Sequence, residues 1–418
     1  LFRYISYTGR GIGTIRKRDR GNDAGNGGEG IVAGKKRVPK RRFEGFTGEW
    51  EERKLGEVVG ITMGQSPSGK NYTDNPNDYI LVQGNADIIN GWVTPRIWTT
   101  QITKTAKKGD IILSVRAPVG DIGKTKYDVV LGRGVAGIRG NEFIFHYLSK
   151  MKNNRYWRRY STGSTFESIN SNDLNEATIR IPCEDEQQKI GNFFKKLDEV
   201  ISLQQRKLEK TKSLKSAYLA EMFPAEGERV PKRRFAGFTD EWKTKKIGEL
   251  MDVTSVKRIH QSDWRKEGIR FLRARDIVAY SNNEQPSDLL YISVEKYKEY
   301  TSLSGKVEIG DLLVTGVGTI GVPMLIENNN PVYFKDGNII WFKNQNRIDG
   351  YFLYYSFKAK YIQNYIKDIA GIGTVGTYTI ENGKQTPIYL PSLEEQKKIG
   401  KFFKQLDDKI SIEQRKLD

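Results

Sequence analysis

The strongest constraint on the fold of this 418-residue chain is that it repeats itself. Arg37–Trp50 has the sequence RVPKRRFEGFTGEW, and Arg229–Trp242, 192 positions later, has RVPKRRFAGFTDEW. A second repeat follows each copy: Glu186–Asp198 has EQQKIGNFFKKLD, and Glu395–Asp407, 209 positions later, has EQKKIGKFFKQLD. The sequences between the repeats differ almost completely. One scaffold used twice with two different inserts favours a protein that binds two targets over an enzyme with one active site.

The composition favours a polyanionic partner. The net charge is +18, which indicates nucleic acid first and an anionic membrane second, with a merely basic soluble protein as the alternative. The single cysteine, Cys183, excludes an intramolecular disulfide and fits a reducing cytoplasm. With only His146 and His260 beside it, a structural zinc site is not expected. No stretch is apolar enough over 18 residues to predict a membrane span.

Residues 1–36 differ in character from the rest of the chain. They contain 9 of the 42 glycines and eight basic against three acidic side chains, so about +13 of the net charge lies elsewhere. Because such a segment buries too little apolar surface to offset its ordering entropy, we expect it to be disordered. A flexible DNA-binding arm is the alternative.

Each copy of the first repeat combines basic residues with large aromatic residues. Basic side chains beside aromatic ones could contact phosphate. The alternative is that the aromatic residues dock the segment on the scaffold while the charges stay in solvent. The aromatic residues in question are Phe43, Phe46, Trp50, Phe235, Phe238 and Trp242.

The second repeat predicts a long amphipathic helix in each copy. Apolar residues follow the 4-3-4-3-4 spacing of a coiled-coil seam, which predicts that the two copies pack antiparallel on each other, with an ordinary core helix as the alternative. The polar pair Gln204 and Glu413 is expected to set the register. The first helix is expected from about Asp185 to Glu221, or roughly 55 Å. The predicted seam residues are Ile190, Phe194, Leu197, Ile201, Leu208, Ile399, Phe403, Leu406, Ile410 and Leu417.

The chain stops at Asp418, which aligns with Glu209 of the first copy. The first helix continues through Lys210–Pro224, so we expect a shortened second helix that lacks 15 aligned residues.

The two inserts, about 58–180 and 250–389, indicate one mixed α/β fold with diverged surfaces. Both contain a Gly-Asp pair before an apolar run, which predicts strands at Asp110–Val115 and Asp311–Thr315. Helices are expected at Phe143–Tyr160 and Asp349–Asp368, followed by loops at Ser161–Thr165 and Gly371–Thr377.

Several polar side chains in the inserts are candidates for contacting DNA. Arginine and lysine contact phosphate or the guanine edge, and asparagine or glutamine contacts adenine, although each residue taken alone is as readily explained as solvated surface. The candidates are Gln65, Ser66, Lys70, Arg116, Arg133 and Arg159 in the first insert, and Lys257, Arg258, Gln261, Arg265, Arg273 and Arg275 in the second.

No motif predicts catalysis by the chain itself. Gly64–Lys70 resembles a phosphate-binding P-loop, but Asn71 occupies the position where a hydroxyl must bind magnesium. A second partial match ends at Thr125, but it has Pro118 where the motif requires its first glycine. Gly371–Gly376 spells a dinucleotide fingerprint but precedes an extended segment rather than a helix. The chain also lacks the Asn/Asp-Pro-Pro-Tyr/Phe tetrapeptide used by amino-methyltransferases.

This ordered, duplicated set of motifs resembles the specificity (S) subunits of type I restriction–modification enzymes. The resemblance covers about Arg37 to Asp418 and rests on both repeats, together with Lys54–Glu57, Gly64–Pro67 and Lys108–Asp110. It implies an α+β protein in which two α/β target-recognition domains, related by a pseudo-twofold repeat, are separated by two long conserved helices packed as an antiparallel coiled coil. The implied parts are a disordered segment (1–36), target-recognition domains at 37–183 and 229–391, and helices at 184–224 and 392–418.

The resemblance also implies the function and the partners. Each domain would recognise one half of a split, asymmetric target in double-stranded DNA, and the helices would set the spacing and dock other subunits. Two modification subunits would bring S-adenosylmethionine, and restriction subunits would bring ATP and Mg²⁺. The chain itself would bind no cofactor, perform no catalysis and act in the cytoplasm of a bacterium or archaeon.

Two other classes of protein remain as alternatives. A fused type II enzyme would need methyltransferase and nuclease motifs, which we do not find in the sequence. A coiled-coil adaptor, or a defective, truncated specificity subunit, would show no preference among DNA sequences.

Overall fold

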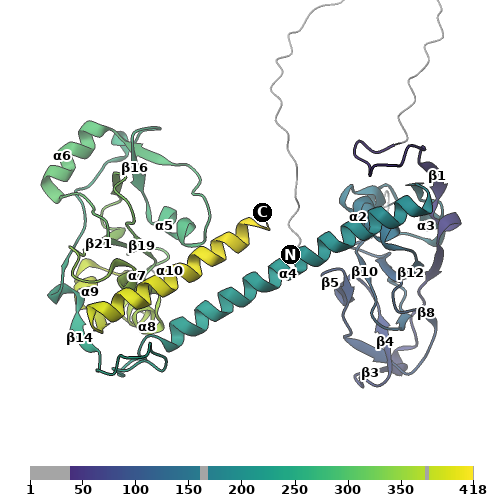
Figure 1. Ribbon diagram of the computed structural model, residues 1–418, viewed down its shortest axis with the longest axis horizontal. Helices are drawn as coiled ribbons and strands as arrows, with labels where there is room; N and C mark the ends of the chain where they lie inside the picture. The colour runs from purple at the N-terminus through teal and green to yellow at the C-terminus, as the bar shows by residue number, and fades with distance from the viewer. Residues whose placement is uncertain (1–37, 161–167, 372–375, 418) are drawn as a thin grey trace, which may run out of the picture. The chain divides into compact units, whose positions relative to one another are not determined.

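The computed structural model describes residues 38–160, 168–371 and 376–417. The expectations for residues 1–36 and for the loop at Ser161–Thr165 concern segments outside these described residues, as do residues 372–375 of the second expected loop. The chain divides into two compact units, unit 1 up to Ser202 and unit 2 from Leu203 onward (Figure 1).

Unit 1 contains two larger sheets and a two-stranded ribbon. Its strands are β1 (Glu51–Lys54), β2 (Gly60–Met63), β3 (Tyr72–Thr73), β4 (Tyr79–Val82), β5 (Ile88–Ile89), β6 (Trp92–Val93), β7 (Ile97–Thr99), β8 (Lys104–Ala106), β9 (Ile111–Ser114), β10 (Ile122–Lys124), β11 (Val129–Leu131), β12 (Val135–Arg139) and β13 (Thr178–Ile181). In the described part, one sheet has the order β2-β12-β9-β10-β6-β5, another has β3-β7-β4-β11-β8, and β1 pairs with β13.

Unit 1 also contains α-helices and 3-10 helices. They are α1 (Leu55–Val58), η1 (Gly69–Asn71), η2 (Asn85–Asp87), α2 (Glu142–Asn153), η3 (Tyr156–Tyr160) and α3 (Ser171–Asn175). The helix α2 lies beside β10 and β12, away from β3 and β4 (Figure 1). Its apolar face, which includes Phe143, Ile144 and Leu148, packs on Ile111 and Leu113 of β9 in the main core of the unit.

Unit 2 contains shorter sheets of the same kind. Its strands are β14 (Lys243–Lys246), β15 (Asp252–Thr254), β16 (Ile269–Leu272), β17 (Leu290–Ile292), β18 (Leu312–Thr315), β19 (Pro323–Leu325), β20 (Val332–Phe334), β21 (Ile339–Lys343) and β22 (Pro387–Leu390). The sheet orders in the described residues are β15-β21-β18-β19, β17-β16-β20 and β14-β22.

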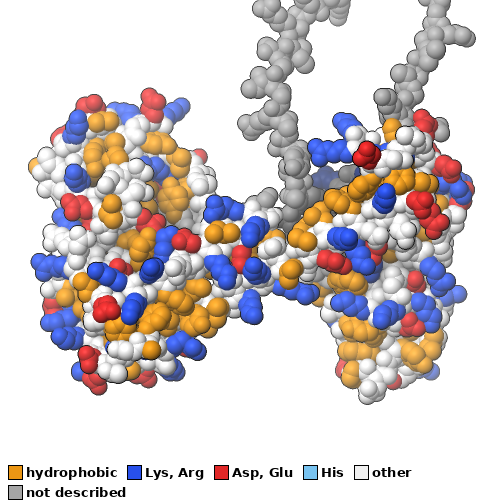
Figure 2. All heavy atoms as spheres, in the orientation of Figure 1, with side chains coloured by type: hydrophobic (Ala, Val, Ile, Leu, Met, Phe, Trp, Pro, Cys, Tyr) orange, Lys and Arg blue, Asp and Glu red, His pale blue; other side chains and the backbone are white. Residues whose placement is uncertain are grey.

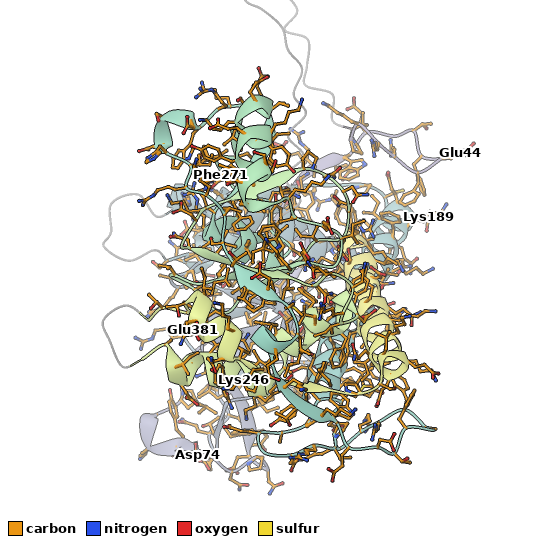
Figure 3. The ribbon with its side chains drawn as sticks, turned by 90° about the vertical axis from the view of Figure 1, so that its left-hand side faces the viewer. Glu44, Asp74, Lys189, Lys246, Phe271 and Glu381 are labelled. Atoms are coloured by element: carbon orange, nitrogen blue, oxygen red, sulfur yellow. The ribbon has the colours of Figure 1, made fainter. Side chains whose placement is uncertain are left out.

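The helices of unit 2 pack around these strands. They are η4 (Ile247–Glu249), η5 (Gln261–Asp263), α5 (Ala274–Ser281), α6 (Val294–Ser304), α7 (Gly350–Lys358), α8 (Lys360–Ile369), α9 (Ile380–Gln385) and α10 (Leu393–Arg415). Phe271 of β16, labelled in Figure 3, is fully buried. Lys246 of β14, also labelled there, donates a hydrogen bond of 2.6 Å to the side-chain carbonyl of Gln385 in α9.

The two units have the same strand connectivity. In unit 1, β9 pairs antiparallel with β10 and β12, and β4 pairs parallel with β11. In unit 2, β18 pairs antiparallel with β19 and β21, and β16 pairs parallel with β20. The expectation that both inserts are one fold is thereby confirmed.

A shared turn explains why the Gly-Asp pair recurs before β9 and β18. The glycines, Gly109 and Gly310, have φ angles of +94° and +93°, a conformation that favours glycine. The aspartates, Asp110 and Asp311, close the turn by accepting a hydrogen bond from a backbone N–H three residues earlier, at 2.8 and 3.0 Å. The repeated pair is therefore a structural motif.

The long helix α4 (Glu184–Glu221) begins in unit 1 and ends in unit 2, close to the predicted bounds. The predicted helix at Asp349–Asp368 is instead two helices, because Ala359 between α7 and α8 is extended, with φ −71° and ψ 148°. Similarly, only the first part of Phe143–Tyr160 is α-helical; a turn at Asn154 and Arg155 follows, and then the 3-10 helix η3.

Among the described residues, no helix combines the length and the apolar character that crossing a membrane requires.

Candidate nucleic-acid interface

A concave cavity of about 480 Å³ opens on unit 1 and brings together three of the predicted DNA-contacting residues. Ser66, Arg116 and Arg133 line it, although they come from three separate loops. The other lining residues are Gln83, Gly84, Asn85, Ser114, Ala117 and Gly134. The lining is polar and basic, as expected of a surface that contacts nucleic acid.

The two arginines of the cavity have exposed side chains available for a ligand. Within the described residues, neither Arg116 nor Arg133 has an ion pair with a carboxylate, and both are solvent-exposed. The backbone N–H of Arg133 donates a hydrogen bond of 3.1 Å to the Ser66 hydroxyl, which fixes the loop and leaves the guanidinium outside the bond. Unpaired guanidinium groups suit phosphate oxygens or the guanine edge.

One side of the cavity is formed by residues that follow two parallel strands. Because β4 and β11 run parallel, the residues that follow them, Gln83 and Gly132, emerge at the same edge of the sheet. A hydrogen bond of 2.7 Å from the Gly132 N–H to the Val82 carbonyl joins the ends of the two strands. The sequence did not indicate Gln83 and Asn85, because their position beside Arg133 results from this pairing of distant strands.

A buried carboxylate holds the loop after β4 in place. Asp87 is 6% exposed and accepts hydrogen bonds from the backbone N–H groups of Gln83 and Gly84, at 2.7 and 3.3 Å. The Arg96 guanidinium lies 3.6 Å from the same carboxylate and donates to the Ala86 carbonyl at 3.2 Å. These contacts give the cavity a rigid wall.

The remaining candidates of unit 1 lie outside the cavity lining. Gln65 and Lys70 are exposed, and the Gln65 carbonyl accepts a hydrogen bond of 2.6 Å from the Thr103 hydroxyl. The backbone of Arg159 lies in η3, while its side chain is outside the described residues.

The candidates of unit 2 are more extensively paired with carboxylates. Arg273 contacts the fully buried Asp276, with its Nη2 at 3.1 Å from Oδ1, and donates to the Asp288 carbonyl at 2.6 Å. Arg275 and Arg258 form exposed ion pairs of 3.4 and 3.5 Å with Asp288 and Asp336. Exposed pairs of this kind contribute little to stability and exchange readily for another anion.

The other three candidates of unit 2 are exposed. The Lys257 ammonium lies 4.6 Å from the centre of the Tyr300 ring. Arg265 donates to the carbonyl groups of Ser262 and Trp264, both at 2.9 Å, and Gln261 begins η5. On the face that Figure 2 shows, lysine and arginine side chains are distributed over both units.

The basic motif at the start of each copy docks on the scaffold. Arg42 donates two hydrogen bonds of 2.7 Å to the Glu186 carboxylate, and Arg234 donates two of 2.7 and 2.8 Å to Glu395. Both glutamates are fully buried. These two arginines therefore serve the structure, while Arg41 beside Arg42 is exposed.

The aromatic residues of the motif complete this docking in the same way in both units. Phe43 packs edge-on against Phe193, and Phe235 against Phe402, each pair with ring centres 5.8 Å apart. The indoles of Trp50 and Trp242 lie 5.7 Å from the rings of Phe143 and Phe352. The docking interpretation is thus confirmed for Phe43, Trp50, Phe235 and Trp242. Its expectation that the charges stay in solvent was wrong for Arg42 and Arg234, because both bind buried glutamates.

In unit 2, α10 and the second part of α4 pack antiparallel. Thr211 contacts Glu413, Lys215 contacts Asp407, and Tyr218 contacts Phe402. Residue numbers therefore increase along α4 as those of their partners in α10 decrease. Leu208 and Ile410 are buried in this unit. The predicted register pair was wrong in one member, because Glu413 contacts the Thr211 hydroxyl at 3.1 Å and Lys207 at 3.9 Å, and not Gln204.

The predicted seam residues divide into three groups. Ile399 and Phe403 are buried in the core of unit 2, with Leu406 packed against it, and Ile190 packs against the core of unit 1. Ile201 and Leu417 are half-buried. Phe194 and Leu197 are 41% and 43% exposed, so these two positions lie on the surface instead of inside a helix pair.

The exposed residues form an apolar stripe on the first part of α4. Phe193, Leu197 and Val200 are spaced by four and three residues, so they share one face of the helix, with Phe194 beside them. Figure 2 shows a row of hydrophobic atoms along the unit 1 portion of this helix. An exposed row of large apolar side chains is typical of an interaction surface.

A profile of the type I restriction modification DNA specificity domain matches residues 47–213 and 239–418. Over 288 residues, 66% of this chain and 65% of the relative, the chain is 23% identical to the specificity subunit of the type I restriction enzyme MjaVIII of Methanocaldococcus jannaschii. It is 32% identical over 175 residues, 40% of this chain and 41% of the relative, to a protein of that organism assigned to the type I restriction enzyme MjaX as its specificity subunit. The aligned part of the chain therefore spans less than two thirds of either relative.

Solved structures show the same fold. The crystal structure of a type I restriction–modification system S subunit from M. genitalium has a TM-score of 0.58 at 17% identity, covering 88% of this chain and 92% of that one. A chain from a structural study of assembly and conformational transition in the type I restriction–modification system has a TM-score of 0.50 at 19% identity, covering 91% and 94%.

Proposed function

Because the chain belongs to the type I restriction modification DNA specificity family, we propose that it is the specificity subunit of a type I restriction–modification enzyme. In this role unit 1 and unit 2 each recognise one half of a split, asymmetric sequence in double-stranded DNA. The chain supplies the sequence preference and performs no catalysis itself.

The observation that carries this proposal is that the units share their scaffold contacts and differ at their exposed loops. The bidentate bond of Arg42 with Glu186 recurs as that of Arg234 with Glu395. The exposed residues differ: unit 1 has Arg116 and Arg133, which have no ion pair within the described residues, whereas Arg258 and Arg275 of unit 2 are paired with carboxylates. A shared frame with different loops is what two independent sequence preferences require.

The predicted DNA-contacting residues stay proposals. Arg116, Arg133 and Ser66 are the strongest in unit 1, because one cavity brings them together. The others are Gln65, Lys70 and Arg159 in unit 1, and Lys257, Arg258, Gln261, Arg265, Arg273 and Arg275 in unit 2. Arg273 is the weakest, since its side chain is 17% exposed and already bound to Asp276.

We propose two modification subunits and the restriction subunits as protein partners. The modification subunits would supply S-adenosylmethionine and methylate adenine at N6, and the restriction subunits would supply ATP and Mg²⁺. The exposed stripe at Phe193, Leu197 and Val200 supports docking of another subunit, because an apolar surface of this kind is stabilised by burial. These partners imply the cytoplasm of a bacterium or archaeon.

An exchange of inserts tests the proposal. Residues 58–180 are replaced by the corresponding insert of another specificity subunit, and the methylated sequences are mapped in cells that also contain the modification subunits. We expect one half of the target to change and the other half to stay as it was. The reciprocal exchange of residues 250–389 is the matched control and should change the opposite half. A change in both halves, or in neither, from a complex that assembles would contradict the modular function and favour an adaptor without sequence preference.

A further inference from the structure

The loops after β4 and β16 occupy the same place in the two units. Both strands pair in parallel with the strand that precedes the glycine-containing turn, Val82 with Leu131 and Leu272 with Phe334. In both units, the first residue of that turn donates a backbone hydrogen bond to the last residue of the neighbouring strand. Gly132 donates to the Val82 carbonyl of β4 at 2.7 Å, and Lys335 donates to the Leu272 carbonyl of β16 at 2.8 Å. Counted from the end of each strand, Asn85 and Arg275 are both the third residue. The buried carboxylate, however, is the fifth residue after β4 (Asp87) and the fourth after β16 (Asp276), so the loop of unit 1 has one residue more before it.

The same device makes both loops rigid. Asp276 is fully buried and accepts a hydrogen bond of 2.9 Å from the backbone N–H of Arg273, the first residue after β16. Asp87 does the same for Gln83, the first residue after β4, at 2.7 Å. A loop fixed through its backbone by a buried carboxylate presents its side chains in a defined direction without using them.

The first residue of each loop uses its side chain within its own unit. The Gln83 amide donates a hydrogen bond of 2.8 Å to the Tyr72 hydroxyl. The Arg273 guanidinium is bound to Asp276 and to the Asp288 carbonyl. These side chains therefore position the loop and are poor candidates for contacting a base.

The third residue of each loop has a side chain that is available. Asn85 lines the cavity beside Arg116 and Arg133, and within the described residues its side-chain amide has no hydrogen-bond partner. Arg275 is 55% exposed, and within the described residues it forms one ion pair, with Asp288, which is 77% exposed. Such a pair exchanges for another acceptor at little cost.

We infer that Asn85 and Arg275, each the third residue after its strand, are base-contacting residues, Asn85 recognising an A·T pair in one half-site and Arg275 a G·C pair in the other. The asparagine amide matches adenine N6 and N7, and the guanidinium matches guanine O6 and N7, in the major groove. The A·T pair is distinct from the methylated one, because a methylated adenine must leave the base stack. This inference rests on the proposed function and adds to it the residue type that selects one base in each half.

The test compares methylation maps of cells that contain the modification subunits and either the wild-type chain, Asn85→Ala, Arg275→Ala or Asn77→Ala. Asn77 is an exposed asparagine that precedes β4 at the opposite end of that strand, and serves as the matched control. With Asn85→Ala, discrimination at one A·T position of one half-site should fall by roughly 10- to 100-fold. With Arg275→Ala, a G·C position of the other half-site should relax to a similar degree, and Asn77→Ala should leave the motif unchanged.

The possible results separate the inference from the proposed function. A wild-type complex that methylates no split motif would contradict the proposed function, and this inference with it. A wild-type split motif that both variants retain in full, or a variant that relaxes the wrong base pair or the same half-site as the other, would overturn the inference alone. Asn85→Gln, which keeps the amide, covers the case in which Asn85→Ala fails to accumulate: retained preference for the A·T pair supports the inference, and relaxation to the other pairs opposes it.

Discussion

At the scale of single residues, adjacent arginines of one motif have different roles. Arg234 donates two hydrogen bonds to the fully buried Glu395, whereas Arg233 forms an exposed ion pair with Glu221. The sequence shows only a run of basic residues, which favours phosphate binding and scaffold docking equally. Burial of the partner carboxylate decides between these roles, and burial depends on the tertiary fold.

Replacing Arg234 by Met should lower the free energy of unfolding by about 2 kcal/mol, because it leaves the buried carboxylate of Glu395 without its partner. This loss of free energy is at the low end for a buried ion pair, because the guanidinium is 12% exposed and partly screened by water. Denaturant unfolding of the full chain measures the change. Arg233→Met is the matched control and should have little effect. Equal losses from both variants would contradict the assigned roles.

His146 of α2 should make unit 1 sensitive to acid. Burial lowers the pKa of His146, with Lys124 acting in the same direction, while Asp198 and Glu142 oppose the shift. Its Nδ1 lies 3.9 Å from Asp198, whose own pKa is raised, also chiefly by burial. Both shifts favour the neutral forms. Because the folded state holds His146 neutral, its contribution to stability is present above the ordinary histidine pKa of about 6.5 and is lost as the pH falls below it.

The free energy of unfolding should therefore decrease between about pH 7 and pH 5. Asp198 contributes with the opposite sign as the pH falls towards its ordinary pKa near 4, so the histidine dominates the upper part of this range. His146→Gln should flatten the dependence, whereas His260→Gln, which changes an exposed histidine, should preserve it. A wild-type pH profile that His146→Gln leaves unaltered would exclude this role.

At the scale of elements, α4 has two differently packed parts. Its second part packs antiparallel with α10 through contacts such as Thr211 with Glu413. Its first part packs Ile190 on the core of unit 1 and exposes Leu197 and Val200. A 4-3 spacing of apolar residues identifies a buried face but does not say which surface buries it, because a seam and a core face have the same periodicity.

Leu197→Asp should leave the folding of the chain nearly unchanged, because the side chain is 43% exposed, and should weaken binding of the modification subunits by about tenfold or more. Gln188→Asp introduces the same charge nine residues away, on the opposite side of the helix, and should leave binding intact. Titration of the purified modification subunits measures both effects. Unchanged binding by Leu197→Asp would show that the stripe has no part in assembly.

Much of the element structure was predictable from the sequence, and the details of the cavity were not. The bounds of α4 and the strands β9 and β18 follow from local patterns and turn residues, and so does the common fold of the two inserts. Ser66, Arg116 and Arg133 were predicted by residue type, but their convergence depends on the parallel pairing of β4 with β11. The same pairing brings Asn85 into the cavity, and no local signal marks it.

At the scale of the whole molecule, the chain presents one scaffold twice. The buried Arg–Glu bonds, the aromatic docking and the strand connectivity recur in both units, while the exposed loops diverge. This arrangement supports the proposal that the chain has two binding surfaces with independent sequence preferences.

The most direct measurement is a genome-wide map of adenine methylation in cells that contain this chain and its modification subunits, with and without the chain. Our account predicts a single split motif, two specified stretches separated by a fixed gap, which disappears when the chain is deleted. A complex that assembles and yet shows no such motif, or a motif that persists without the chain, would contradict the conclusion that the two units specify the DNA target.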